Sequence, residues 1–466
     1  MNNIIGIVNT TMVRQIKAFQ ARFAQSVESM LGEVISPKRL EEYIKAEVET
    51  WRNRTFTPIL TLLMFIEQSL SADKSCNEAV SKERDAQASR GERQCSSNNS
   101  SYCTARKKLP LALISRIGKE VGAELVAKQP KAWLWRGRQI KLVDGTTVTM
   151  PDTPANQAVF PQNSQQKQGL GFPMARIVAI VSLSCGAVLE WATDACVGKQ
   201  TGETALLWKL SEKFRPGDVV IADRYYSGYF MIAWLIQHGV DIVFRQHSNR
   251  KTDFRRGQRL GKKDHLAHWS RPSRPLWMSQ DVYETMPETL TIREAQVGGW
   301  IIVSTLIDAR EVQKVELSNL YRLRWYVELD IRSIKSVMQM DVLRCKSPEM
   351  IHKEIAAHFA AYNLVRTVMA QAADQHHLSP RGLSFKGALQ ELRAFGKSLS
   401  ICFCESFISL CSALFAGIAQ RKLPYRPGRV EPRAVKRRPK PRALLTKPRK
   451  VEQERLRKMI YEYAIR

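Results

Sequence analysis

One segment of the chain, Tyr321–Lys335, combines a carboxylate, an aromatic hydroxyl and cations at helical spacing. An α-helix turns by about 100° per residue, so residues three, four or seven apart share one face. A single stripe would then carry Tyr321, Arg324, Glu328 and Lys335, with Arg332 one turn beyond the glutamate. Such a carboxylate can hold a divalent metal while its neighbours bind phosphates. The alternative is a surface helix crossed by ion pairs.

Two aspartates could join this glutamate. Asp144 ends the short apolar run that starts at Ile140, and Asp223 ends the run that starts at Val219. Strand-end acids that converge in a sheet, with a helix acid opposite, form a set of hard oxygen ligands for Mg²⁺. Two such ions about 4 Å apart suit phosphoryl transfer. A turn or helix-cap role is the alternative for either aspartate.

Other acids lie nearby in the sequence and compete for the same roles. They are Asp152, Asp194, Asp308 and Asp330. On a regular helix Asp330 would point about 160° away from Glu328, which makes it a poor substitute.

The elements around the two aspartates alternate as in a mixed α/β sheet. Apolar β-type runs and helical runs follow in the order β-β-β-α-β-α-β, and a tight turn at Cys185-Gly186 joins the second and third strands. The expected segments are 140–149, 176–184, 187–193, 203–214 (helix), 219–223, 228–238 (helix) and 241–245. The fold class is therefore predicted to be α/β.

The rest of the chain divides by composition and periodicity. We expect a helical, DNA-binding domain over 1–135, with 102–108 as a possible recognition helix, and a β-rich insertion with a basic face over 246–308. The catalytic core would comprise 136–245 and 309–373, with helices from about 311 to 340 and from 350 to 373. C-terminal helices would span 374–420 and a basic tail 421–466. Within that tail, Arg421–Lys450 holds thirteen basic residues, one acid and six prolines. This composition predicts a segment that is extended or disordered when free and that contacts phosphates, with a solubilising tail as the alternative.

Composition limits the partners and the compartment. The 466 residues include 72 Lys or Arg against 44 Asp or Glu, a net charge of +28, which favours a polyanion such as nucleic acid over a membrane. Nine scattered cysteines, without zinc-ligand spacing, indicate thiols in a reducing cytosol. We find no signal-peptide pattern at the start, and Ile401–Gln420 is typical of a packed helix. A soluble, cytoplasmic protein is expected.

The chain resembles the DDE transposases of the bacterial insertion-sequence-four family. That family's Y-x2-R-x3-E-x6-K signature is matched at every spacing by Tyr321, Arg324, Glu328 and Lys335. Leu142-Val-Asp144-Gly-Thr-Thr is similar to the family's first acidic motif, and Ile221-Ala-Asp223-Arg-Tyr-Tyr to its second. The resemblance covers about 138–372, and a β insertion before the third acid is also a family trait.

The resemblance implies an RNase H-like core that binds two Mg²⁺ ions, or Mn²⁺ in their place, through Asp144, Asp223 and Glu328. Such enzymes cleave the inverted-repeat ends of an insertion sequence, in some relatives through a DNA hairpin, and join the 3′ ends to target DNA. The partners implied are DNA and, in the DNA complex, a second copy of the chain, which places the protein at the bacterial nucleoid. The DNA contacts implied are Tyr321, Arg324, Lys335, Arg224 and Arg332.

Trp300 lies where hairpin-forming relatives carry a tryptophan that stacks on a flipped base. A core aromatic at the end of a strand is the alternative for this residue. Two other functions remain open at this point: a DNA-binding protein that has lost catalysis, and a structure-selective nuclease on the same core.

Overall fold

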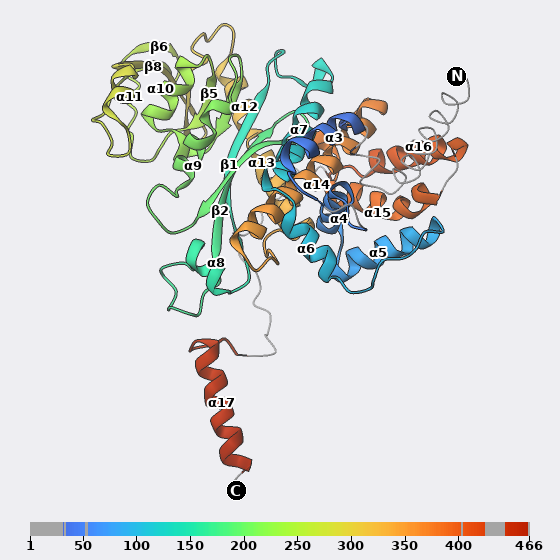
Figure 1. Ribbon diagram of the computed structural model, residues 1–466. Helices are drawn as coiled ribbons and strands as arrows, with labels where there is room; N and C mark the ends of the chain where they lie inside the picture. The colour runs from blue at the N-terminus through green and yellow to red at the C-terminus, as the bar shows by residue number, and fades with distance from the viewer. Residues whose placement is uncertain (1–30, 32–33, 52–54, 402–403, 425–442, 465–466) are drawn as a thin grey trace.

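The computed structural model describes residues 31, 34–51, 55–401, 404–424 and 443–464. Its centre is a nine-stranded mixed sheet in the order β3-β2-β1-β4-β5-β9-β8-β7-β6 (Figure 1). The strands are β1 (Ile140–Thr149), β2 (Met174–Ser182), β3 (Val188–Ala195), β4 (Val219–Ala222), β5 (Asp241–Arg245), β6 (Gln258–Gly261), β7 (Asp264–Ser270), β8 (Thr289–Val297) and β9 (Trp300–Ser304).

The first five strands have the RNase H-like arrangement. They follow the order 3-2-1-4-5. β2 is antiparallel to both β1 and β3, whereas β4 is parallel to β1 and β5 is parallel to β4. Helices cover both faces of this part of the sheet, which is why β4 is buried along its whole length. The predicted α/β, RNase H-like fold is confirmed.

Helices lie on both faces of the sheet (Figure 1), and a separate hydrophobic cluster fills each face. On one face α7 (Leu111–Lys128) and α14 (Pro348–Gln375) pack against β3 and belong to the same cluster as Leu142 and Ile221. On the other face α9 (Glu203–Leu210) and α10 (Tyr229–Gln237) pack over Val143 and Val220. Because side chains alternate along a strand, neighbouring residues of β1 and β4 face different helices.

The N-terminal helices are α3 (Pro37–Glu47), α4 (Pro58–Leu70), α5 (Cys76–Ser89) and α6 (Ser100–Lys108). Residues of α3 and α4 belong to the larger of the two clusters, whereas Ala79 and Val80 of α5 and Tyr102 of α6 form a separate small cluster with Met64 of α4. Ser36 caps α3, since its Oγ accepts from the Arg39 N–H at 3.3 Å. Residues of α3 and α4 share one continuous core with α7 and α14, so these helices and the sheet are joined by apolar packing.

The segment 246–308 extends the central sheet. It contributes β6 to β9 and the short α11 (Gln280–Thr285), and β9 pairs with β5 through Phe244 and Val303. A buried ion pair joins β7 and β8: Arg293, with no exposed surface, donates two hydrogen bonds to Asp264 at 2.9 and 2.7 Å. The same guanidinium donates to the Val312 carbonyl at 2.6 Å, which ties the outer strands to the following helices.

The predicted helical stretch over 311–340 consists of three successive elements. The chain forms α12 (Lys314–Arg322), then α13 (Trp325–Arg332), then a π-helical turn, η4 (Ser333–Val337). The remaining helical elements are α8 (Pro154–Val159), α15 (Phe385–Ile401), α16 (Cys404–Gln420) and the 3₁₀ turns η1 (Lys131–Trp133), η2 (Ser211–Lys213), η3 (Arg224–Tyr226) and η5 (Pro380–Gly382).

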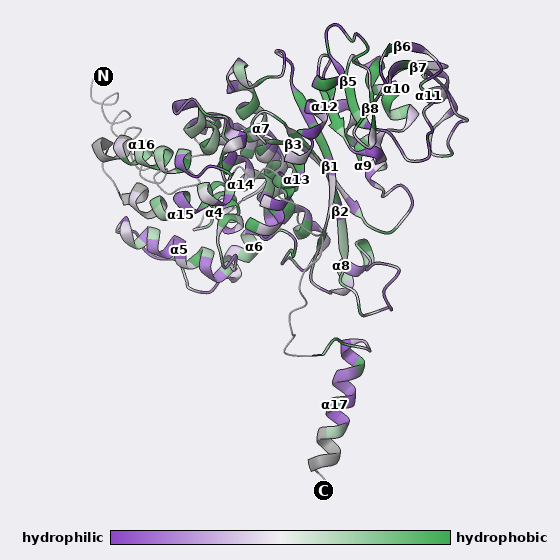
Figure 2. Ribbon diagram, turned by 180° about the vertical axis from the view of Figure 1, so that it is seen from behind, coloured by the Kyte–Doolittle hydropathy of each residue, from purple (hydrophilic) through white to green (hydrophobic). Residues whose placement is uncertain are grey.

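The C-terminal region ends in a helix. Residues 425–442 of the predicted extended segment lie outside the described residues. Beyond them, α17 (Arg449–Ala464) is a helix that projects from the body and is largely hydrophilic (Figures 1 and 2). Among the described residues, no helix has the length and apolar character needed to cross a membrane.

Candidate active site

The register of two parallel strands places Asp144 beside Asp223. Leu142 of β1 pairs with Ile221 of β4, and each aspartate follows two residues later on the same face. Asp144 lies within β1, which continues to Thr149, whereas Asp223 follows the last residue of β4. The Asp223 carboxylate also caps η3, because its Oδ1 accepts from the Tyr225 N–H at 2.8 Å.

Arg324 joins Asp144 to Glu328. Its Nη1 lies 3.3 Å from Asp144 Oδ2, and its Nη2 donates to Glu328 Oε1. The side chains of Arg324 and Asp144 are 19% and 18% exposed, so water screens the pair only weakly. One guanidinium thus holds the carboxylate of β1 and the carboxylate of α13 on the same side of the sheet.

The predicted single helical stripe is not what brings these residues together. Tyr321 lies in α12, and Arg324 precedes α13 at a tight turn in which its N–H donates to the Tyr321 carbonyl at 3.0 Å. Lys335 lies in the π-helical turn, where each residue rotates by less than 100°. Angles counted from an ideal α-helix therefore do not apply between Tyr321 and Lys335.

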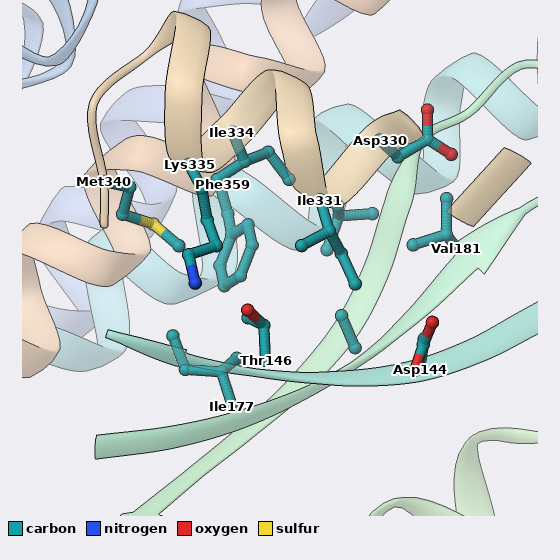
Figure 3. A pocket seen from close by; sticks show the side chains of 12 residues that line it. Asp144, Thr146, Ile177, Val181, Asp330, Ile331, Ile334, Lys335, Met340 and Phe359 are labelled. Atoms are coloured by element: carbon teal, nitrogen blue, oxygen red, sulfur yellow. The ribbon is translucent and has the colours of Figure 1, made fainter. Parts of the chain in front are cut away.

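Lys335 nevertheless reaches the strand that carries Asp144. Its Nζ donates to the Thr147 carbonyl of β1 at 2.7 Å. In Figure 3 the lysine side chain extends from its helix toward the strands, across a pocket that Asp144 and Thr146 also line. The ammonium group is therefore fixed on the same strand as the first aspartate.

Trp300 lies beside Tyr321 at the start of β9. The indole is 49% exposed, and its ring centroid is 6.3 Å from that of Tyr321 in an edge-to-face arrangement. The Arg245 guanidinium lies over the indole, 4.8 Å from the centroid. An indole with half its surface exposed is not a core residue, so the alternative of a core aromatic does not describe Trp300.

Arg224 and Arg332 lie further from these contacts. Arg224, half-buried in η3 directly after Asp223, places its guanidinium 5.4 Å from the Tyr225 ring centroid. Arg332 is exposed at the end of α13.

Asp330, which the sequence analysis weighs as a competitor of Glu328 for metal binding, has a structural role. It has no exposed surface, and it accepts hydrogen bonds from the Tyr362 hydroxyl at 2.9 Å and from Nη1 and Nη2 of Arg381, each at 2.9 Å. Arg366 forms a further ion pair with it. A Cβ at Gly186 would lie 2.1 Å from Arg381 Nη1, so this cluster also requires the glycine at the β2–β3 turn. Asp330 therefore anchors α13.

The other competing acids are engaged elsewhere. Asp194 pairs with Lys209 at 2.6 Å, Asp308 pairs with Arg310 at 3.3 Å, and Asp152 accepts from Gln157 at 2.8 Å.

Burial and charge together act on Asp144. Burial raises the pKa of its carboxyl to about 6, and the carboxylates of Asp223 and Glu203 act in the same direction. The Gly145 N–H, at 2.8 Å, and Arg324 oppose this shift. A raised pKa from desolvation beside like charges is common where an active site gathers carboxylates.

Glu203 is the acidic residue that the sequence analysis missed. It begins α9, and its Oε2 accepts from the buried Tyr226 hydroxyl at 3.3 Å. A Cβ at Gly145 would lie 2.4 Å from Glu203 Cδ. No motif spacing links Glu203 to Asp144, because it arrives from the opposite face of the sheet. The glycine directly after Asp144 was the one available signal.

The donor set fits a hard divalent cation in its chemistry. Asp144, Asp223 and Glu328 provide carboxylate oxygens, which Mg²⁺ and Mn²⁺ prefer. Within the part of the chain that the structure describes, no three Asp, Glu, His or Cys side chains are yet gathered closely enough to hold a metal ion. Because Arg324 contacts both Asp144 and Glu328, its guanidinium would have to move for a cation to contact both.

Comparison with known proteins gives the family. A family model described as "Transposase DDE domain" matches residues 135–364, a span that contains both aspartates and Glu328. The chain is 28% identical over 346 residues to the Escherichia coli (strain K12) "Transposase InsG for insertion sequence element IS4", with 70% of this chain and 75% of that protein aligned.

Two more distant similarities are shorter or looser. The Escherichia coli "Transposase for insertion sequence element IS421" is 29% identical over 79 residues, 17% of this chain and 21% of that protein. The solved structure of a piggyBac transposase synaptic complex with hairpin DNA aligns over 87% of both chains, at 10% identity and a TM-score of 0.44. From the DDE-domain match and the similarity to the IS4 transposase, the chain belongs to the DDE transposases of the insertion-sequence-four family.

Proposed function

We propose that this transposase binds the inverted-repeat ends of an insertion sequence, cleaves them with Mg²⁺ and joins the freed 3′ ends to target DNA. The observation that carries the proposal is the alignment of β1 with β4, which puts Asp144 beside Asp223, together with the Arg324 contacts that bring Glu328 to Asp144. Hard oxygen donors from two strands and a helix suit metal-dependent phosphoryl transfer.

Asp144, Asp223 and Glu328 would hold the divalent ions. When bound, such ions activate the attacking oxygen and stabilise the leaving oxygen of the phosphodiester. The half-buried position of Asp144 limits water around the site, which strengthens its charge interactions. Asp330 keeps α13, and so Glu328, in a fixed orientation through its bonds to Tyr362 and Arg381.

Cations around the carboxylates would bind the DNA backbone. Arg324 would exchange its carboxylate partners for a phosphate near the cut when cations enter, and Lys335 presents an ammonium on the β1 side. Arg224 follows Asp223, and Arg332 is exposed, so both could add phosphate contacts. Tyr321 supports the exposed Trp300 ring, on which an unpaired end base would stack in a DNA-hairpin route.

The proposal is tested with end-labelled DNA that carries the repeats flanking the coding region. The wild-type chain with Mg²⁺ should nick the transferred strand, produce a DNA hairpin and join the 3′ end to a target plasmid. A DNA-binding protein without catalysis would shift the labelled ends but leave them uncut. A structure-selective nuclease would cut them and form no joined product. DNA of scrambled repeat sequence is the matched control, and equal cleavage of both substrates would contradict the proposal.

A further inference from the structure

A fourth carboxylate approaches the two aspartates from the far face of the sheet. Glu203 is the first residue of α9, which packs on the face opposite α13. Gly145 points to that face, and the three atoms nearest to a Cβ built there all belong to the Glu203 side chain, at 2.4 to 2.8 Å. The absence of a side chain at Gly145 therefore lets the Glu203 carboxylate lie against the backbone next to Asp144.

The carboxylate is also fixed from the side of Asp223. The Tyr226 hydroxyl donates to Glu203 Oε2 at 3.3 Å, and Tyr226 has no exposed surface. Tyr226 ends η3, the turn that Asp223 caps. Glu203 is thus in contact with the residue that follows the first aspartate and with the turn that follows the second.

Electrostatics agree with this placement. Burial raises the pKa of Glu203, and the negative charge of Asp223 raises it further, while the Tyr226 hydrogen bond and Arg176 oppose the shift. The carboxylates of Glu203, Asp144 and Asp223 therefore interact in a half-buried region where charges are weakly screened. A divalent cation beside the aspartates would relieve this repulsion.

We propose that Glu203, held by Tyr226 against Gly145, is a positioning residue of the active site that strengthens divalent-cation binding by Asp144 and Asp223. This inference rests on the proposed function, because it assumes that the aspartates bind the cation. Glu203 acts through its charge and through the turn of Tyr226, and the two aspartates remain the groups that contact the ion.

The test is Mn²⁺ titration of the full-length protein without DNA, followed by electron paramagnetic resonance of the free ion. Glu203→Gln removes the charge and keeps the shape, so it should weaken Mn²⁺ binding by about 10-fold, the loss typical of groups that support metal ligands. Glu203→Asp should retain more affinity than the glutamine variant. Glu212→Gln changes an exposed carboxylate on the neighbouring η2 turn and should bind Mn²⁺ like the wild type.

A second variant displaces the carboxylate without removing it. Gly145→Ala would place a methyl group 2.4 Å from Glu203 Cδ and should weaken Mn²⁺ binding as Glu203→Gln does. Thermal unfolding in the absence of metal checks that each variant is folded. Because two independent changes act on one carboxylate, the inference stays testable even when one variant fails to fold.

Asp144→Asn separates failure of this inference from failure of the proposed function. Loss of binding in Asp144→Asn with wild-type affinity in folded Glu203→Gln would overturn the role of Glu203 and leave the proposed function intact. Absence of Mn²⁺ binding in the wild type, or unchanged binding in Asp144→Asn, would overturn the proposed function and this inference with it.

Discussion

The ionised carboxylate of Asp144 lowers the stability of the folded protein, and its proposed role in binding cations explains why it is kept. Its pKa of about 6 lies above the ordinary value of 3.8, so the folded protein holds the ionised carboxylate less favourably than the unfolded chain does. The difference corresponds to roughly 3 kcal/mol at a pH above both values. An active site that gathers carboxylates for a cation is expected to be destabilised in this way when the cation is absent.

Asp144→Asn should therefore stabilise the metal-free protein. The cost is fully present above about pH 6, shrinks as pH falls through about 6, and is absent below about pH 4, where aspartate is protonated in both states. Urea unfolding in a chelating buffer should show a gain of up to roughly 3 kcal/mol at pH 8 and almost none at pH 4. A variant that is less stable than the wild type at pH 8 would show that the Arg324 contact outweighs the burial of the charge.

Trp300 is the residue that tests the DNA-hairpin route. A base that leaves the end of a duplex can recover about 1–3 kcal/mol by stacking on an aromatic ring. Trp300→Ala should slow hairpin formation by roughly 5- to 150-fold and leave the first nick almost unchanged, and Trp300→Phe should recover part of the rate. Rates of both steps can be followed on one labelled end. Equal loss in the two steps would identify a folding defect, and no loss in either would remove Trp300 from the route.

At the scale of elements, the site depends on a broken helix. The tight turn between α12 and α13 lets Arg324 contact Asp144 while Tyr321 packs on Trp300, and the π-helical turn aims Lys335 at β1. The residue types and spacings of the segment predict a metal-binding glutamate among cations that bind phosphate. The break could not be predicted, because it follows from packing on strands distant in the sequence and from the Asp330 cluster.

Asp330→Asn should loosen α13. The change removes the charge that compensates two buried guanidinium groups, those of Arg366 and Arg381. Loss of one partner of a buried ion pair typically costs about 3–5 kcal/mol. Chemical unfolding should show a loss of that order, and end cleavage should fall in proportion to the loss of fixed Glu328 geometry.

Glu328→Gln is the matched comparison for this experiment, because it alters a carboxylate on the same helix that is 30% exposed and outside the buried cluster. It should unfold close to the wild type. Wild-type stability in Asp330→Asn would mean that α13 is held by its apolar packing alone.

At the scale of the whole molecule, the N-terminal helices α3 and α4 share one core with the sheet, whereas α17 projects from the body (Figure 1). Residues 421–423 are bonded to the body: Arg421 pairs with Glu391 at 2.8 Å, and the Leu423 N–H donates to the Gly382 carbonyl at 2.7 Å. The predicted tail boundary at 421 is therefore too early as a point of truncation.

Deletion of residues 425–466 should weaken DNA binding for all sequences and flatten its salt dependence, because fewer counterions are released from the DNA. Binding isotherms at several salt concentrations measure both quantities. A control truncation after residue 448 removes α17 alone and should give a smaller change. An unchanged affinity and an unchanged slope after the full deletion would exclude a role in phosphate binding.

The sequence was sufficient for the fold class, and it singled out the two aspartates and the Tyr-Arg-Glu-Lys set, whose catalytic and DNA-binding roles remain predictions. Short apolar runs that end in an acid predict strands of a sheet that is covered on both faces, and the net positive charge indicates a polyanionic partner. Glu203 could not be predicted, since its approach depends on how α9 packs against Gly145 of β1, a contact between segments distant in the sequence. Nor could the pairing of β6 to β9 onto the central sheet be predicted, because strand partners of distant segments leave no local pattern.

Cleavage of labelled element ends by Glu328→Gln tests the central claim most directly. The substitution keeps the size of the side chain and removes one proposed metal-binding charge, so end binding should persist while Mg²⁺-dependent cleavage falls by at least about 100-fold. Asp308→Asn, which alters an acid that pairs with Arg310 outside the site, should cleave like the wild type. Cleavage by Glu328→Gln at the wild-type rate would remove Glu328 from the catalytic set and contradict the proposed active site.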